Sequence, residues 1–301
     1  MEIKEFAQYV QRQVEEILGA EYKVKIQEVR KNNDVLMQGM TILSEQNNIC
    51  PTIYLEELWE AYNNGISLSE IIENVVRIYK QDMRGKNLNM AFFKSFERVR
   101  DRICYRLISA EKNRKLLEDI PYIPYLDMAV SFYYAYQGDD LGMGTILVHN
   151  SHMEMWQTTV EELFLLAQEN TPRLFPWVSS SIDEIMQECG EQQDQEEAAR
   201  RSLYEKMPFR VLTNRQRAFG AACMLYSGVL EELAEKEQAD FFILPSSVHE
   251  VILLADKGGD WGRRLKEMVE EINVSQTEPE EVLSDSLYYY DRTEKSIKVI
   301  F

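Results

Sequence analysis

The sequence predicts an α+β protein in which helices are mixed with a largely antiparallel sheet built from hairpins. Residues 22–30 and 35–43 alternate apolar and polar side chains around a short polar turn, which is typical of a hairpin. The C-terminal third reads as strand, helix, strand pair, helix and strand pair. This order mixes helices with hairpins, so it favours an α+β fold over a doubly wound parallel sheet.

The first third of the chain begins with a strong helical pattern. Apolar residues at three- and four-residue spacing predict an amphipathic helix, and Gly19 ends it. Two further helices follow the hairpin, and Ser67 is placed to cap the second of them. The helices are expected at 3–18, 55–64 and 68–83, and a short extended segment at 49–55.

The middle of the chain contains one ambiguous stretch, residues 98–108, whose pattern fits a strand or a helix. We favour a strand from about residue 99, because Ser109 could then cap a helix at 110–118. Residues 123–136 are rich in β-branched and aromatic side chains and predict one long strand. Residues 145–150 are expected to return beside it, and a helix at 158–170 to stop at Pro172.

The C-terminal elements are clearer. Residues 220–226 are apolar and predict a strand, and a helix follows near Ser227. The remaining elements are a strand pair at 239–245 and 249–256, a helix at 260–273 and a final hairpin at 285–292 and 295–301.

At 301 residues the chain could form one large domain or two smaller ones. We expect one integrated α+β unit over 1–301. The alternative is a division into 1–186 and 202–301, joined by the very polar stretch 187–201. Four cysteines without C-x-x-C spacing indicate reduced thiols, and the N-terminus lacks the basic and apolar regions of a signal peptide, so a cytoplasmic location is expected.

The most unusual property of the composition is its excess of acidic over basic residues. Fifty-one acidic against 33 basic residues give a net charge of −18. Such a surface repels nucleic acid and anionic membranes, and no apolar run approaches the roughly 20 residues needed to cross a bilayer. We therefore expect neither direct nucleic-acid binding nor a membrane role. The acidity could serve solubility alone, or it could bind a protein partner with a basic surface.

Two of the three histidines, His149 and His152, fall within the ten residues LVHNSHMEMW. H-x-x-H spacing can place two imidazoles on one metal ion, with Glu154 or the distant His249 as a third ligand. The sequence has no HExxH helix and no nearby cysteine pair. Helix capping and surface exposure are the plainer interpretations of these histidines.

A second candidate is LPSSVHEV, which places Ser247, His249 and Glu250 together. A nucleophilic serine needs a base within hydrogen-bond reach and a group that orients the base. Neither a G-x-S-x-G nor an S-x-x-K motif is found in the sequence, and Pro-Ser-Ser is also ordinary turn composition.

Four arginines form the third candidate. If their segment is a strand, they line one face and could bind a phosphate or carboxylate. The plainer interpretation is that they neutralise nearby acids such as Glu97, Asp101 and Glu111. These anion-binding candidates are Arg98, Arg100, Arg102 and Arg106.

Several segments taken together resemble an uncharacterised bacterial family, a domain of unknown function from anaerobic Gram-positive gut bacteria. The segments span most of the chain: NICPTIYLEELWEAYNNG, IPYLDMAVSFYYAY, LAQENTP, VLTNRQRAFGAACMLY, ILPSSVHEVILL and MVEEIN with EEVLSDSLYYYD. The resemblance brings no established activity, cofactor or catalytic residue, and it implies an association with mobile genetic elements.

The function expected from these observations is a non-enzymatic interaction or regulatory role that uses an acidic surface. The alternative is a metal-assisted or serine-type hydrolase built from His149, His152 and His249. No cofactor and no oligomeric state can be derived from the sequence.

Overall fold

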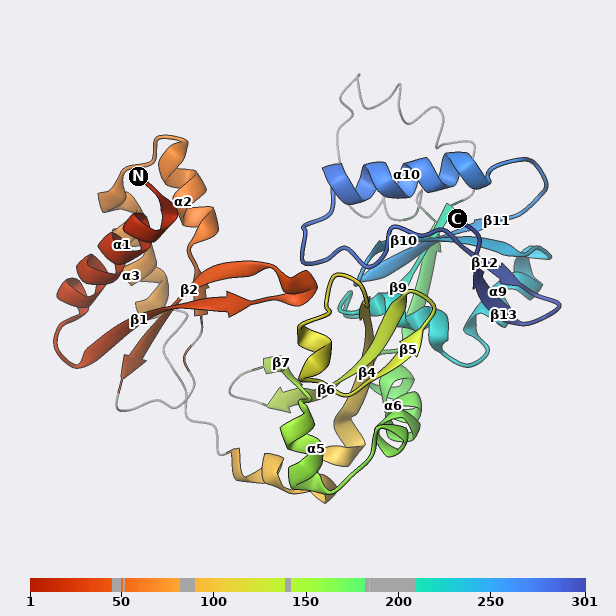
Figure 1. The fold of residues 1–301 in the computed structure, drawn as a ribbon, viewed down its shortest axis with the longest axis horizontal. Helices are drawn as coiled ribbons and strands as arrows, with labels where there is room; N and C mark the ends of the chain where they lie inside the picture. Colours follow the sequence, from red (N-terminus) through yellow and green to blue (C-terminus); the bar gives the residue numbers. More distant parts are fainter. Residues whose placement is uncertain (45–49, 51, 82–89, 139–141, 182–183, 185–208) are drawn as a thin grey trace. The chain divides into compact units, whose positions relative to one another are not determined.

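The computed structural model spans residues 1–301 and describes all of them except 45–49, 51, 82–89, 139–141, 182–183 and 185–208. The chain forms two compact units, shown in Figure 1. The first comprises residues 1–92 with 137–142, and the second comprises 93–136 with 143–301. The polar stretch 187–201 lies outside the described residues, and integration of the whole chain into one unit stays a prediction.

In the first unit, helices pack against a three-stranded sheet of order β1-β2-β3. Val24 pairs with Ile42 and Ile26 with Met40, so one face of the sheet is apolar and packs on the helices. Phe6 and its neighbours on the apolar face of the first helix fill this core. The elements are α1 (Ile3–Leu18), β1 (Tyr22–Arg30), β2 (Leu36–Ser44), β3 (Thr52–Tyr54), α2 (Glu56–Asn63) and α3 (Leu68–Gln81). Each element expected in this region is confirmed within the described residues, and residues 49, 51, 82 and 83 of the expected ranges lie outside them.

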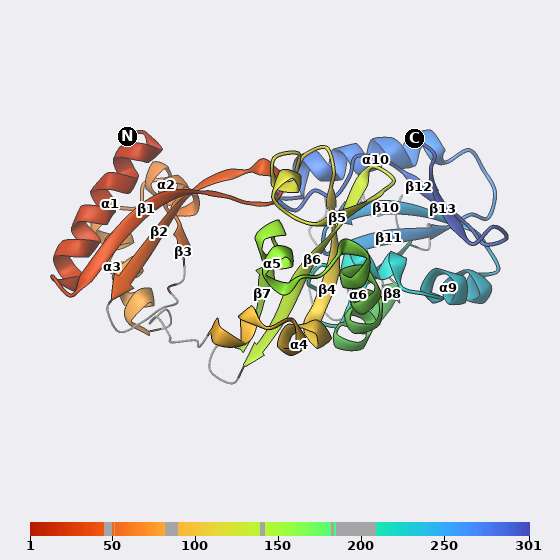
Figure 2. The same ribbon diagram turned by 60° about the horizontal axis from the view of Figure 1, so that its bottom comes forward.

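The second unit contains two sheets. In the smaller one β6 lies between β4 and β5 and also pairs with β7, and α6 packs on β4. Its elements are α4 (Phe96–Val99), β4 (Ile103–Ser109), β5 (Tyr122–Tyr125), β6 (Met128–Gly138), β7 (Gly142–Leu147), α5 (Asn150–Trp156) and α6 (Val160–Leu174). Figure 2 shows α6 beside this sheet.

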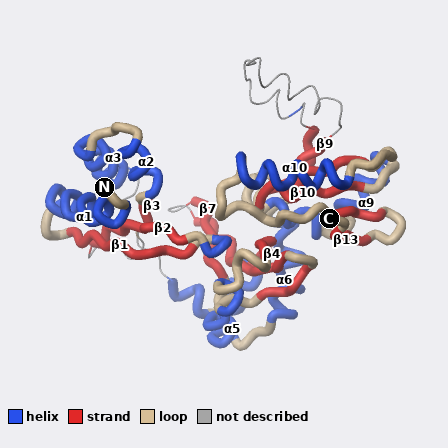
Figure 3. Tube along the Cα trace, turned by 45° about the horizontal axis from the view of Figure 1, so that its top comes forward, coloured by secondary structure: helices blue, strands red, loops and turns tan. Residues whose placement is uncertain are grey.

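The larger sheet has six strands in the order β13-β12-β10-β11-β9-β8. Helix α10 packs on β10, as the blue helix above the red strands in Figure 3 shows. The elements are β8 (Trp177–Ser181), β9 (Phe209–Asn214), α9 (Val229–Glu237), β10 (Phe241–Ser247), β11 (Glu250–Ala255), α10 (Gly262–Ser275), β12 (Tyr288–Asp291) and β13 (Ser296–Val299). Helices with mostly antiparallel sheets confirm the α+β prediction.

The expected long strand over 123–136 is instead two strands. A two-residue turn, Leu126 and Asp127, reverses the chain, so that Tyr125 pairs with Met128. Leu126 takes a left-handed conformation with φ of 53°, which a leucine rarely adopts. The usual Asn-Gly turn signal is therefore missing, and the hairpin is hidden within an apolar run.

Three other expectations were wrong. Residues 110–115 form turns before a short 3-10 helix (Leu116–Glu118), because the Ser109 hydroxyl and carbonyl hold this loop through Lys112 and Asn113. Residues 220–225 form a buried 3-10 helix, since apolar composition alone does not distinguish it from a strand. Helix α6 continues through Pro172 to Leu174.

Gly220 at the start of that 3-10 helix is packed too closely for a side chain. A Cβ there would lie 2.5 Å from the His249 carbonyl oxygen and 2.8 Å from the Asn214 backbone nitrogen. Gly220→Ala is expected to lower the free energy of unfolding by about 1–3 kcal/mol, measured by urea denaturation. Gly144→Ala, with open space around its Cβ, is the control, and equal loss in both variants would contradict the packing argument.

Candidate functional site

The two clustered histidines mark the start of α5. His149 precedes the helix, and its backbone N–H donates to His152 Nδ1 at 3.1 Å. His149 Nδ1 lies 2.7 Å from Asp119 Oδ2, and the Asn150 backbone N–H donates to the Asp119 carbonyl. The His149 ring therefore holds the start of α5 against the loop at Asp119, while the His152 ring accepts a backbone N–H at the helix start, which fits the capping interpretation.

His152 is held in an aromatic environment. Its ring lies edge-on to Phe93 at 5.0 Å between centroids and 5.6 Å from the Trp156 ring, and these two rings are in contact with each other at 5.1 Å. Burial, reinforced by the charge of His149, lowers the pKa of His152 below its usual value. A neutral ring is also what the hydrogen bond requires, because Nδ1 must accept from His149.

His249 contacts a separate set of residues. Its Nδ1 accepts the Phe219 backbone N–H at 3.1 Å, and its Nε2 lies 3.3 Å from Glu281 Oε1. The Ser247 hydroxyl accepts the His249 backbone N–H and forms no bond to the ring. Both ring nitrogens are thus engaged away from Ser247, and the third member of the candidate, Glu250, has its pKa raised by burial. These contacts give no support to serine activation.

The metal interpretation also lacks an assembled ligand set. Among the residues that the structure describes, no three His, Cys, Asp or Glu side chains are grouped to hold a metal ion. The contacts found for His149 and His152 run to Asp119 and to aromatic rings, while His249 contacts Phe219 and Glu281. A site of His149, His152, Glu154 and His249 stays a prediction.

The four arginines do not line one strand, because β4 begins only at Ile103. Arg98 lies in α4, Arg100 and Arg102 lie in a 3-10 turn, and Arg106 alone lies on β4. The strand expected from about residue 99 is thus confirmed only from Ile103, and its start was wrong because residues 96–102 are helical.

Three of these arginines have identified partners. Arg100 pairs with Glu97 at 3.3 Å, and Arg102 donates to the Ala135 carbonyl. Arg106 donates to Ser131 at 3.4 Å and lies 4.8 Å above the Phe219 ring, while burial lowers its pKa to about 10.

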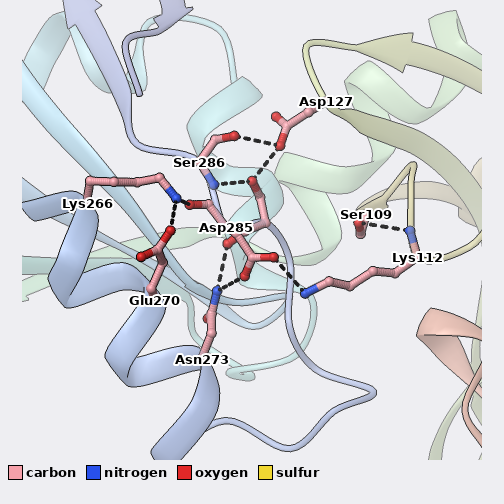
Figure 4. A network of polar contacts seen from close by, with 9 residues as sticks. Ser109, Lys112, Asp127, Lys266, Glu270, Asn273, Asp285 and Ser286 are labelled. Atoms are coloured by element: carbon pink, nitrogen blue, oxygen red, sulfur yellow. Dashed lines mark hydrogen bonds and ion pairs between the residues drawn. The ribbon is translucent and has the colours of Figure 1, made fainter.

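The structure also contains a polar network that the sequence pattern does not indicate (Figure 4). The Asp127 carboxylate accepts hydrogen bonds from Ser284 at 2.5 Å, Ser286 at 3.1 Å and Tyr288 at 2.6 Å. It thereby ties the β5–β6 turn to the segment before β12, more than 150 residues along the chain. The only local signal was an aspartate in an apolar run, which does not reveal such a distant partner.

Asp285 extends this network to α10. Its carboxylate accepts from Asn273 at 2.8 Å and pairs with Lys112 at 3.1 Å, while Lys266 donates to its carbonyl at 2.7 Å. Burial raises the pKa of Asp285, but the hydrogen bonds from Asn273 and Lys112 outweigh it and lower the pKa overall. The network orders the chain between α10 and β12, and its geometry is that of a structural support.

The helices α5 and α6 carry exposed apolar and acidic side chains. The two exposed apolar side chains are Leu165 on α6, at 65% exposure, and Met155 on α5, at 43%. Among the residues that the structure describes, none of the carboxylates on these helices forms an ion pair. These carboxylates belong to Glu154, Glu161, Glu162 and Glu169. We call these six residues the α5–α6 surface.

Local interactions keep this surface in place. Thr159 caps α6 by accepting the Glu162 backbone N–H at 3.2 Å, and the Thr158 hydroxyl donates to the Glu162 carboxylate. Leu163 and Ala167 face inward and are fully buried, so Glu161, Leu165 and Glu169 lie in one row on the outer side. Hydrogen bonds from its own backbone N–H and from Thr159 lower the pKa of Glu161, which keeps it ionised.

Comparison with protein families matches residues 3–292 to a family of unknown function, DUF5688. The chain belongs to the DUF5688 family. The resemblance found in the sequence is confirmed to this extent: the family covers nearly the whole chain and has no established function. No curated protein and no solved structure matches this DUF5688 chain. Among its described helices, none is long and apolar enough to cross a membrane.

The neutral state of His152 in this DUF5688 chain has a consequence for pH dependence. Because its folded pKa lies below the unfolded value, the unfolded state binds the proton more readily. This contribution to stability is present above the unfolded pKa of about 6.5 and is lost as pH falls through the folded pKa. His152→Asn retains an acceptor for the His149 N–H but cannot titrate in this range. Urea unfolding at pH 8 and pH 5 should show a smaller loss in the variant than in the wild type, and identical losses would contradict the assignment.

Asp127 is expected to be the most sensitive position of the polar network. Asp127→Ala leaves three hydroxyl donors without their acceptor and should lower the free energy of unfolding by about 2–4 kcal/mol. Asp260→Ala removes an exposed carboxylate and is the control. Chemical denaturation of both variants measures the difference, and a loss below about 0.5 kcal/mol in Asp127→Ala would show that the network contributes little.

Proposed function

We propose that this DUF5688 protein is a non-enzymatic binding protein whose α5–α6 surface engages a protein partner with a basic surface. The observation that carries the proposal is that α5 and α6 carry exposed Leu165 and Met155 together with four carboxylates that form no ion pair within the described part of the chain, two of which, Glu161 and Glu169, flank Leu165 on α6. Carboxylates favour a partner that presents lysine or arginine, and the apolar side chains supply area that gains from burial.

Several acids elsewhere in the second unit do have cationic partners. On and around α9, Glu231 pairs with Lys295 and Glu237 with Lys257. Asp240 is close to Arg292, and Asp291 is close to Lys298. These acids already have cationic neighbours, and no large apolar side chain on α9 is exposed. Compared with α9, the α5–α6 surface offers both the unpaired charge and the apolar contact that a basic partner needs.

The partner best suited to this surface is an amphipathic segment with lysines or arginines flanking an apolar side chain. Leu165 lies four residues from Glu161 and four from Glu169 on α6. This spacing places an apolar contact between two negative charges on one helical row. A complementary helix would place one apolar residue between two basic ones. The hydrolase alternative, the cytoplasmic location and the association with mobile elements stay predictions.

A peptide of lysine and leucine at helical spacing tests the proposal, with a glutamate–leucine peptide of the same pattern as its counterpart. We expect saturable binding of the basic peptide to the full chain by calorimetry, and no binding of the acidic one. Affinity should fall at least about tenfold between low and high salt, because exposed charges are screened. Equal binding of both peptides would contradict the proposal.

Charge reversal locates the binding surface. Glu161→Lys with Glu169→Lys should weaken the basic peptide by at least about tenfold, since both charges flank Leu165. Glu232→Lys with Glu235→Lys on α9 changes net charge equally and is the matched control. Leu165→Ser separates the apolar contribution and should weaken binding without altering its salt dependence. If the two double variants lose the same affinity, the effect is one of overall charge and the assigned surface is wrong.

A further inference from the structure

The second unit contains a cavity of about 500 Å³, a volume typical of small-molecule sites. Its walls come from both sheets and from the segments between them. Ile123 and Val130 contribute from the small sheet and Ile297 from β13, while Phe164 and Leu230 contribute from the helices. The lining is thus largely apolar, and an apolar body placed there would lose contact with water.

Two tyrosines bring polar groups into this apolar lining. Tyr290 is only 5% exposed, and Tyr125 is half-buried. Among the described residues, neither hydroxyl forms a hydrogen bond. The two tyrosines that precede Tyr290 in β12 do form hydrogen bonds: Tyr288 donates to Asp127, and Tyr289 contacts Asp240 and Asp256. Although the Tyr290 side chain as a whole is buried, its hydroxyl oxygen is not fully enclosed, so a ligand that accepts a hydrogen bond would replace water there.

The charges at the cavity cancel each other. Glu231 at the start of α9 and Lys295 before β13 both line it and form an ion pair with one another. Burial raises the pKa of Tyr125 and of Tyr290, and the charge of Glu231 raises that of Tyr290 further, so both hydroxyls stay protonated and can donate. A charged ligand would have to compete with the existing ion pair, whereas a neutral one would not.

We propose that this cavity binds an uncharged apolar small molecule carrying one hydrogen-bond acceptor, such as a carbonyl oxygen, which Tyr290 and Tyr125 bind through their hydroxyls. The apolar lining holds the body of the ligand. The Glu231–Lys295 ion pair also lines the cavity and contributes no net charge to it. The site is distinct from the α5–α6 surface, and neither proposal depends on the other.

Three probes with the same ring system and different charge test the ligand class: acetylnaphthalene, naphthoate and naphthylmethylamine. Calorimetry on the full chain should show saturable binding of the neutral ketone and weaker binding of the anion and the cation. Absence of saturable ketone binding would overturn the proposal. Tighter binding of either charged probe would overturn the assignment of an uncharged ligand.

Substitutions locate the probe within the cavity. Tyr290→Phe and Tyr125→Phe each remove one hydroxyl and should weaken the ketone about 3- to 10-fold, the range expected for one hydrogen bond. Ile297→Trp fills the cavity from β13 and should abolish binding. Tyr122→Phe, on the same strand as Tyr125 but outside the lining, is the control. Thermal unfolding without ligand confirms that each variant is folded, and unchanged ketone affinity in both tyrosine variants would overturn the proposed contacts.

Discussion

The carboxylate of Asp127 is the interaction on which the arrangement of the second unit depends. One side chain accepts hydrogen bonds from three hydroxyls of a segment far away in the sequence, and so joins the β5–β6 turn to the start of β12. Tyr125 directly precedes that turn, and Tyr290 lies two residues beyond the bonded Tyr288. The two hydroxyls that line the cavity are therefore positioned by the same contact.

Local patterns were sufficient where a short segment carries its own signal. Helix α1 and the β1–β2 hairpin follow directly from apolar spacing and from the polar turn between them. Local sequence patterns failed where tertiary contacts determine the backbone conformation. Leu126 turns left-handed between two strands, and the 3-10 helix after Phe219 is set by close packing around Gly220. No propensity of leucine or alanine indicates either outcome.

The candidate sites show the same division. Proximity of His149 and His152 follows from their spacing, and the contact between them is present. Asp119 and Phe93, which fix what the two rings can do, lie far from them in sequence and could not be identified. The arginines illustrate the reverse case, because a stripe that alternation suggested is divided among a helix, a 3-10 turn and a strand. Net charge likewise did not indicate where an acidic binding surface would lie, because acids in ion pairs and acids without them contribute to it equally.

The hydrogen bond between the His149 backbone and His152 Nδ1 also limits the coordination chemistry of this segment. A nitrogen lone pair that accepts a proton donor cannot bind a cation at the same time. An ion coordinated by His152 Nδ1 would have to break the hydrogen bond from the His149 backbone N–H at the start of α5. The coordinating atom compatible with the helix is therefore Nε2. A histidine spacing that suggests a metal site can thus instead form the N-terminal cap of a helix.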